Sequence, residues 1–324
     1  MSADPFDRIG LVVHPRRELS NALATIREWA ERQGSEVVQL RSPGQEQEVA
    51  PRGEVGACDL VLALGGDGTT LAALRAAAPL GRPVVGIACG SLGALTAVTA
   101  DRIEHALDRI SRGDYEQRRL PALVAEQNGG EELTALNDLV LVRGGAGQVM
   151  FEIQVDGERF IRLAGDGLLA ATPLGSSAYT LAAGGPMLTG GAGGLVLTPL
   201  APHGGVCPPL VTGPEAEVTV ILETGNGGAR VELDGQVHAE LGERETTTFE
   251  LRLDPGFATL VSLGEEESTI AGLRRRRILM DSPRVLARDD RDAQSGGRSQ
   301  PPSDASSSAA SASSERSEPR APIS

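Results

Sequence analysis

Lysine is absent from this chain of 324 residues, so all 30 residues in the combined lysine and arginine count are arginine. The absence excludes every mechanism that needs a lysine amine, including the lysine of the Walker A loop GxxxxGK[ST] and any Schiff base. Chemistry on phosphate groups in this chain must therefore use other residues.

Cysteines and long apolar runs are also scarce. Cys58, Cys89 and Cys207 lie far apart, in a pattern that fits neither a disulfide framework nor paired metal ligands. No apolar run is long enough to span a bilayer, and the first ten residues, MSADPFDRIG, hold early acids where a secretory signal needs basic residues. We expect a cytoplasmic protein with no membrane partner and no protein-held metal.

Negative charge dominates the chain, whose formal net charge is −14 at pH 7. A surface of this sign opposes attraction to nucleic acids and to anionic membranes. The basic run Arg274 to Arg277 is therefore predicted to be a solvated helix face and not a nucleic-acid patch. The hydrophobic content of 40% supports a sizeable core, and the length indicates two domains.

The first third of the chain alternates strand and helix patterns. Strands are predicted at residues 9–14, 37–40, 60–64 and 84–87, and helices at 19–32 and 71–78. This alternation indicates an α/β domain, residues 1–115, with a mostly parallel sheet of the Rossmann-like kind. Such sheets bind ligands at the carboxyl ends of their strands.

A second pattern begins near residue 116. Short alternating runs separated by glycine and acidic turns predict an all-β domain over 116–265, with hairpin turns at 155–158 and 223–227. A C-terminal segment, 266–286, follows. Residues 287–324 hold too few large aliphatic side chains to bury, so we predict a disordered tail there.

One acid stands within a glycine loop, in LALGGDGTTL at 62–71. The loop leaves a predicted strand and precedes a helix predicted to open at Thr69 or Thr70, which is a phosphate-binding position. An acid there would repel phosphate unless it binds Mg²⁺ or accepts a proton from an attacking hydroxyl. Taken alone, a Gly-Asp-Gly turn more often indicates a plain bend with Asp67 capping the helix.

A longer motif adds to this loop. LAGDGLLAATPLGSSAYTLAAGGPML, at 163–188, closely resembles the signature of the NAD kinases, which share the GGDGT loop with a wider group of kinases. Shorter matching pieces lie at 84–96, 135–141, 197–203 and 232–236, so the resemblance spans roughly residues 8 to 286. It implies transfer of a phosphoryl group from ATP or polyphosphate to the 2′-hydroxyl of the adenosine ribose of NAD or NADH, giving NADP(H). Two alternatives stay open: a lipid or small-alcohol kinase that shares only the loop, and a non-catalytic nucleotide-binding regulator.

The resemblance also implies roles for individual residues. Asp67 would accept the 2′-hydroxyl proton, and Mg²⁺ or another divalent cation would arrive with the nucleotide. The implied phosphate contacts are Gly66, Gly68 and Thr69, and the implied NAD contacts are Asn137, Asp138, Asp166, Ser176, Ser177, Ala178 and Tyr179. Arg16 and Arg17 follow the first predicted strand, so we expect them either to add ATP phosphate contacts or to be a solvated loop pair. In the family the Tyr179 segment reaches across a subunit interface, so a homodimer or homotetramer is implied, and the C-terminal segment packs back on the first domain.

Four positions depart from the family pattern. Ala88, Ala94, Asp138 and Pro208 stand where Asn, Phe, Glu and Arg are usual. Ala94 removes an aromatic group near the adenine position, and Asp138 is one methylene shorter than Glu. These changes concern the affinity for NAD and the choice between NAD and NADH more than the reaction itself.

Overall fold

The structure is a computed structural model that describes residues 6–42, 44, 47–189, 191–264 and 268–296. The chain divides into two units, Met1–Arg276 and Arg277–Ser324. Among the described residues, no helix is long and apolar enough to cross a membrane.

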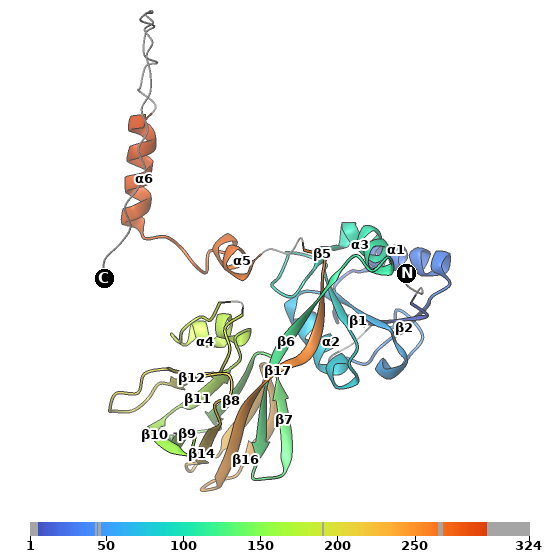
Figure 1. Cartoon of the computed structure of the whole chain (residues 1–324). Coiled ribbons are helices and arrows are strands. Elements are labelled where there is room, and N and C mark those ends of the chain that lie inside the picture. The colour runs from blue at the N-terminus through green and yellow to red at the C-terminus, as the bar shows by residue number, and fades with distance from the viewer. Residues whose placement is uncertain (1–5, 43, 45–46, 190, 265–267, 297–324) are drawn as a thin grey trace, which may run out of the picture. The chain divides into compact units, whose positions relative to one another are not determined.

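The first lobe of the larger unit is the predicted α/β domain. Its strands β1 (Arg8–Val13), β2 (Glu36–Gln39), β3 (Leu60–Gly65) and β4 (Val84–Ala88) pair in parallel in the order β2-β1-β3-β4. The helices α1 (Ser20–Gln33), α2 (Asp67–Ala77) and α3 (Ile103–Ser111) flank them (Figure 1). All five residues of β4 are buried, as expected for a parallel sheet that is covered on both faces.

Helix α1 illustrates how the sequence forms this lobe. Its buried residues recur at helical spacing, and they include Trp29, which is fully buried and donates its indole N–H to Asp108 Oδ1 of α3 at 2.8 Å. The helix ends at Gly34, whose φ of 76° is the left-handed conformation that glycine favours at a helix C-terminus.

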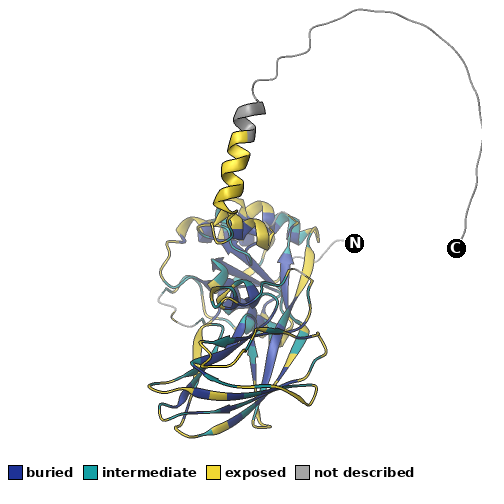
Figure 2. Cartoon of the chain, turned by 90° about the vertical axis from the view of Figure 1, so that its left-hand side faces the viewer, coloured by how far each residue is buried: buried dark blue, intermediate teal, exposed yellow. Residues whose placement is uncertain are grey.

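The first lobe also contains the short strand β5 (Val98–Thr99), which pairs with β4. The second lobe is built from two layers of strands. Its elements are β6 (Glu116–Gln127), β7 (Glu131–Ala135), β8 (Asp138–Arg143), β9 (Val149–Val155), β10 (Glu158–Gly165), β11 (Gly167–Ala171), α4 (Tyr179–Ala182), β12 (Val196–Leu200), β13 (Leu210–Val211), β14 (Val218–Glu223), β15 (Ala229–Leu233), β16 (Gln236–Leu241) and β17 (Thr246–Ser262). One layer is an antiparallel sheet, β13-β12-β11-β8-β15-β16, and the other contains β10-β9-β14-β17 with β6 and β7. Figure 2 shows buried residues along the strands of this lobe.

Strand β17 joins the two lobes. It pairs antiparallel with β6 and β14 in the second lobe and reaches β4 in parallel, with Leu260 opposite Val84. A single sheet of 11 strands therefore runs from one lobe into the other, and the two-lobe fold class predicted from sequence is confirmed (Figure 1). Side chains of both layers, including Phe151, Phe249, Leu141 and Leu168, form the core of the second lobe.

One predicted hairpin is present and one is wrong. The turn at 155–158 joins β9 to β10, with φ near 51° at Asp156 and 78° at Gly157. The turn predicted at 223–227 instead connects β14 of one sheet to β15 of the other. A glycine-rich turn sequence indicates a change of direction, but it does not determine which strands pair afterwards.

The C-terminal segment differs in part from the prediction. Helix α5 (Thr269–Arg275) belongs to the first unit, where Leu273 is buried and Arg275 donates to the Leu92 carbonyl at 2.8 Å. Helix α6 (Pro283–Gly296) extends into the segment where the sequence predicted the disordered tail to begin. Pro283 stands at the first helical position, which proline favours, and alanine and arginine sustain a helix without burial. The rest of the predicted tail, 297–324, lies outside the described residues.

Candidate active site

The glycine turn after β3 opens directly into helix α2. Gly66 is the N-cap in an extended conformation, and its carbonyl accepts the amides of Thr69 and Thr70 at 3.0 Å each. The helix begins at Asp67, two or three residues earlier than the Thr69 or Thr70 start predicted from sequence. An acid is favourable in the first helical turn because the unpaired amides there carry partial positive charge.

The Asp67 carboxylate is fixed by the loop that follows β4. Its Oδ2 accepts the amide of Ala94 at 3.1 Å, and its Oδ1 accepts the amide of Leu95 at 2.9 Å. Both donors are backbone groups, so the departure to alanine at position 94 does not affect them. A carboxylate has about four lone-pair sites, so these two bonds orient Asp67 and leave it able to accept further hydrogen bonds.

Gly93 makes this arrangement possible. A Cβ atom at position 93 would lie 2.1 Å from Asp67 Oδ1, so only glycine lets the carboxylate approach the loop this closely.

We expect Gly93→Ala to displace the carboxylate and lower turnover by about tenfold to a hundredfold, because small misplacements of reacting groups are costly. Steady-state kinetics checks this result. Gly213→Ala is the control, since no heavy atom lies within 4 Å of a Cβ there; an equal loss in both variants would contradict the prediction.

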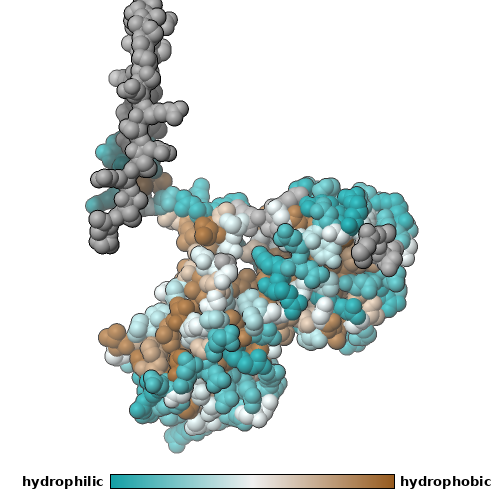
Figure 3. All heavy atoms as spheres, in the orientation of Figure 1, coloured by the Kyte–Doolittle hydropathy of each residue, from teal (hydrophilic) through white to brown (hydrophobic). Residues whose placement is uncertain are grey.

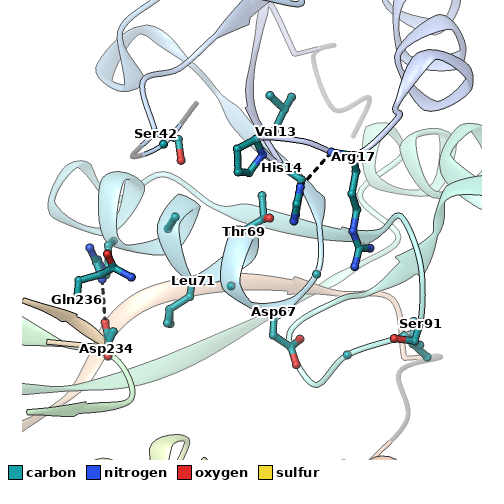
Figure 4. Close-up of a pocket in the computed structure, with 18 of the residues that line it drawn as sticks. Val13, His14, Arg17, Ser42, Asp67, Thr69, Leu71, Ser91, Asp234 and Gln236 are labelled. Atoms are coloured by element: carbon teal, nitrogen blue, oxygen red, sulfur yellow. Dashed lines mark hydrogen bonds and ion pairs between the residues drawn. The ribbon is translucent and has the colours of Figure 1, made fainter. Parts of the chain in front are cut away.

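Asp67 lies at a cavity of about 620 Å³ that both lobes line. The first lobe contributes the ends of β1 and β3 and the start of α2, and the second contributes the turn between β15 and β16 (Figure 4). The lining residues used below are His14, Arg17, Gly66, Asp67, Gly68, Thr69, Arg75, Gly93, Asp234, Gln236 and Arg276. The cavity thus lies at the carboxyl ends of parallel strands, where such sheets bind ligands.

Three arginines line the cavity and make it suitable for an anion. Arg17 donates from Nη1 to the Cys89 carbonyl at 2.8 Å, which holds its side chain against the loop after β4. Arg75 lies on α2 and Arg276 follows α5. The basic run was predicted to be only a solvated face, but Arg276 lines this cavity. Arg16 lies outside the lining set.

Asp234 connects the two lobes behind the cavity. Its side chain is fully buried and accepts backbone amides from Leu136 at 3.2 Å, Asn137 at 2.6 Å and Asp138 at 3.2 Å. Arg75 Nη1 lies 3.6 Å from Asp234 Oδ2. The Asp234 carboxylate therefore ties the segment that carries Asn137 and Asp138 to the helix that begins at Asp67.

Comparisons with known proteins identify the family. The family profile of the ATP-NAD kinase N-terminal domain matches residues 9–115, and that of the C-terminal domain matches 136–251. The chain belongs to the ATP-NAD kinase family. A protein named NAD kinase from Neisseria meningitidis is 34% identical over 269 residues, covering 78% of this chain and 90% of its own length. Another from Shewanella frigidimarina is 32% identical over 247 residues, covering 72% and 79%.

Solved structures agree on the fold. A crystal structure of an NAD kinase from Archaeoglobus fulgidus in complex with ATP has a TM-score of 0.62 at 25% identity and covers 80% of this chain and 94% of that one. A yeast NADH kinase complexed with NADH has a TM-score of 0.69 at 20% identity, covering 86% and 89%. The predicted family, fold class and enzyme class, a kinase of the NAD kinase family, are confirmed.

The residues that the family resemblance assigned to NAD divide between two places. Asn137 is half-buried and Asp138 is only 4% exposed, both beside Asp234. Asp166 and Tyr179 instead line a second cavity of about 450 Å³, where Arg143 Nε donates to Asp166 Oδ1 at 2.7 Å. Among the described residues, neither Asn137 nor Asp138 belongs to the lining of this second cavity.

The Ser176–Tyr179 segment is held by its own hydrogen bonds. Ser176 is fully buried, and its hydroxyl donates to the Pro173 carbonyl at 2.7 Å and accepts the Leu188 amide at 2.9 Å. The Ser177 hydroxyl donates to the Leu174 carbonyl at 3.2 Å. Ala178 and Tyr179 are exposed. The serines thus shape the turn that presents the two exposed residues.

Burial and nearby charge act together on Asp138. Desolvation, followed by the charges of Asp234 and Glu232, raises the pKa of Asp138 from 3.8 to about 7. A protonated Asp138 can donate a hydrogen bond, whereas the ionised form can only accept. Asp138 thus keeps an acid at the position where the family usually has Glu. The protonation of its carboxyl changes near neutral pH.

Several residues of the site were missed from sequence. His14 and Arg75 lack a local motif that would mark them, and Arg276 was noted only as part of the basic run Arg274 to Arg277. The places of all three in the cavity depend on packing. Asp234 lies in the piece ELDGQ at 232–236, which resembles the family, so the signal existed without a role attached to it.

Proposed function

We propose that this kinase transfers the terminal phosphoryl group of ATP or polyphosphate to the 2′-hydroxyl of the adenosine ribose of NAD or NADH, giving NADP(H). The observation that supports it most is the fixed carboxylate of Asp67 in a cavity lined by three arginines. This combination offers a proton acceptor for an alcohol and positive charge for a chain of phosphates.

In the proposed reaction Asp67 accepts the proton of the ribose hydroxyl as its oxygen attacks the terminal phosphorus. The new bond joins that oxygen to phosphorus, the bond from phosphorus to the bridging oxygen breaks, and ADP or a shortened polyphosphate leaves. Gly66, Gly68 and Thr69 border the phosphate. Phosphoryl transfer depends mainly on positioning and charge neutralisation, so backbone amides and Arg17, Arg75 and Arg276 can serve without a lysine.

A divalent cation fits this site when the nucleotide brings it. Among the described residues, no three His, Cys, Asp or Glu side chains gather as a protein-held metal centre requires. Of the two described carboxylates that line the cavity, the Asp234 side chain is fully buried and bound by amides, which leaves Asp67 to face a cation. Mg²⁺ commonly takes one or two carboxylates together with substrate phosphates. When bound, it would neutralise charge that develops on the phosphates.

The separation of the NAD residues supports assembly with a second copy. Asp166 and Tyr179 line a cavity without Asp67, so one chain would complete the NAD site of another as a homodimer or homotetramer. Large apolar side chains are exposed on the second lobe, including Phe160, Tyr179, Val206 and Val211. Figure 3 shows apolar groups where Figure 1 places α4 and β12. Light scattering tests the assembly, and a monomer with full activity would contradict it.

Three free cysteines, with Cys58 buried, fit the reducing cytoplasm as the compartment. The product NADP would make the chain an enzyme of NADP biosynthesis there.

One set of incubations tests the activity. The full chain is mixed with Mg²⁺, NAD or NADH, and ATP or polyphosphate, and NADP or NADPH is measured by a coupled dehydrogenase. Formation of either product in a Mg²⁺-dependent manner supports the proposal, and the four combinations identify the donor and the redox form. Binding of ATP without any product would favour a regulator, and phosphorylation of a lipid or small alcohol alone would favour the other kinase reading. Either outcome would overturn the proposal.

A further inference from the structure

His14 lies at the edge of the cavity beside the glycine turn. It follows the last residue of β1, and its backbone amide donates to the Leu64 carbonyl at 2.8 Å, next to Gly65 and Gly66. This bond continues the pairing of β1 with β3 and fixes the position of His14 against the phosphate loop. The side chain lines the cavity together with Thr69 (Figure 4).

The turn after β1 determines the protonation of the ring. Nδ1 of His14 lies 3.2 Å from the backbone nitrogens of both Arg16 and Arg17, and each of those groups can only donate a hydrogen. Nδ1 must therefore be an acceptor without a proton, and a neutral ring carries its proton on Nε2. An imidazolium would place an N–H group against two other N–H groups.

The surroundings of the ring also favour the neutral form. Burial and the positive charges of Arg17 and Arg16 lower the pKa of His14 below 6.5. Within the part of the chain that the structure describes, Nε2 has no hydrogen-bond partner. The ring is thus a neutral donor that is held in place by the turn and available to a ligand in the cavity.

We propose that His14 binds the phosphoryl donor by donating Nε2–H to an oxygen of its phosphate chain. This inference rests on the proposed function and adds a residue to the donor subsite. The ligand class is a chain of linked phosphates, whether it belongs to a nucleoside triphosphate or to inorganic polyphosphate. A phosphate oxygen is a strong acceptor, and Arg17 on the adjacent turn supplies charge while His14 supplies a directed bond.

Two substitutions separate ligand binding from support of the turn. In His14→Asn the Oδ1 atom can replace Nδ1 as acceptor for the two amides, while its amide N–H groups take the place of Cδ2 and do not reach the former Nε2 position. In His14→Gln the longer amide can place an N–H near the former Nε2 position, while the acceptor for the turn is lost. Binding of Mg²⁺-ATP and of inorganic tripolyphosphate is measured by calorimetry without NAD, together with the melting temperature.

We expect His14→Asn to melt like the parent and to bind both phosphate chains about tenfold or more weakly, the scale of a hydrogen bond to a charged group. His14→Gln should melt lower and keep its affinity within about threefold. His105→Asn, on the exposed side of α3, is the control and should change neither value. Parent-like affinity in His14→Asn, or a larger loss in His14→Gln than in His14→Asn, would overturn the inference. A weakening for ATP alone would also overturn it, because the contact would then involve the nucleoside.

These measurements do not depend on the acceptor. If the chain binds phosphate chains as expected but forms no NADP, the proposed function fails while the role of His14 stands. If NADP forms and His14→Asn raises no KM for the donor, the proposed function stands while the role of His14 fails.

Discussion

Replacing Asp67 with Asn should leave the chain folded and lower the turnover of NAD by at least about a hundredfold, the usual scale for the loss of a general base. The Asn side chain has the same size, so one of its atoms can still accept the Leu95 amide that binds Asp67 Oδ1 at 2.9 Å. It cannot accept a proton from the ribose hydroxyl. The measurement is kcat with saturating NAD, ATP and Mg²⁺, with the melting temperature recorded for both proteins.

A matched control lies at the other end of strand β3. Asp59 precedes β3 at the opposite end from Asp67, and its Oδ2 also accepts a backbone amide, from Arg8 at 3.0 Å. Asp59→Asn therefore removes the same charge and weakens a similar bond away from the cavity, and we expect its kcat to stay within about twofold of the parent. Full activity in Asp67→Asn, or equal losses in both variants, would refute the role of Asp67 as proton acceptor.

Asp138→Asn should change how stability depends on pH. The folded chain keeps the Asp138 proton up to a pKa of about 7, whereas the unfolded chain releases it near 3.8. Between these values the unfolded state binds fewer protons, so Asp138 makes the free energy of unfolding fall as pH rises. A difference of this size corresponds to roughly 4 kcal/mol in total, at about 1.4 kcal/mol for each pKa unit.

The variant lacks this titration, so its free energy of unfolding relative to the parent should rise by roughly 3 kcal/mol between about pH 5 and about pH 8. Urea denaturation at several pH values between these limits measures the effect. Glu250→Gln, on an exposed position of β17, is the control and should run parallel to the parent. A constant difference between Asp138→Asn and the parent would show that the carboxyl ionises normally in the folded chain.

Local features of the fold were predictable because they depend on residues close together in sequence. Apolar spacing predicted α1 to within one residue at each end, and the alternation of strands and helices predicted the parallel sheet. The start of α2 was misplaced because a glycine turn continues into a helix without a break in pattern. The turn at 223–227 was misjudged because pairing partners of β14 and β15 lie far away in the sequence.

The sequence by itself determined the absence of lysine chemistry, the two-lobe fold class, the family and the acid within its glycine loop. Each follows from residue types or from contiguous motifs. Only the tertiary structure decided how Asp67 is held, since the amides that bind it lie 27 and 28 residues away, and how Asp234 joins segments nearly a hundred residues apart. Such contacts arise when strand order places distant loops at one edge of a sheet, and no local pattern encodes that order.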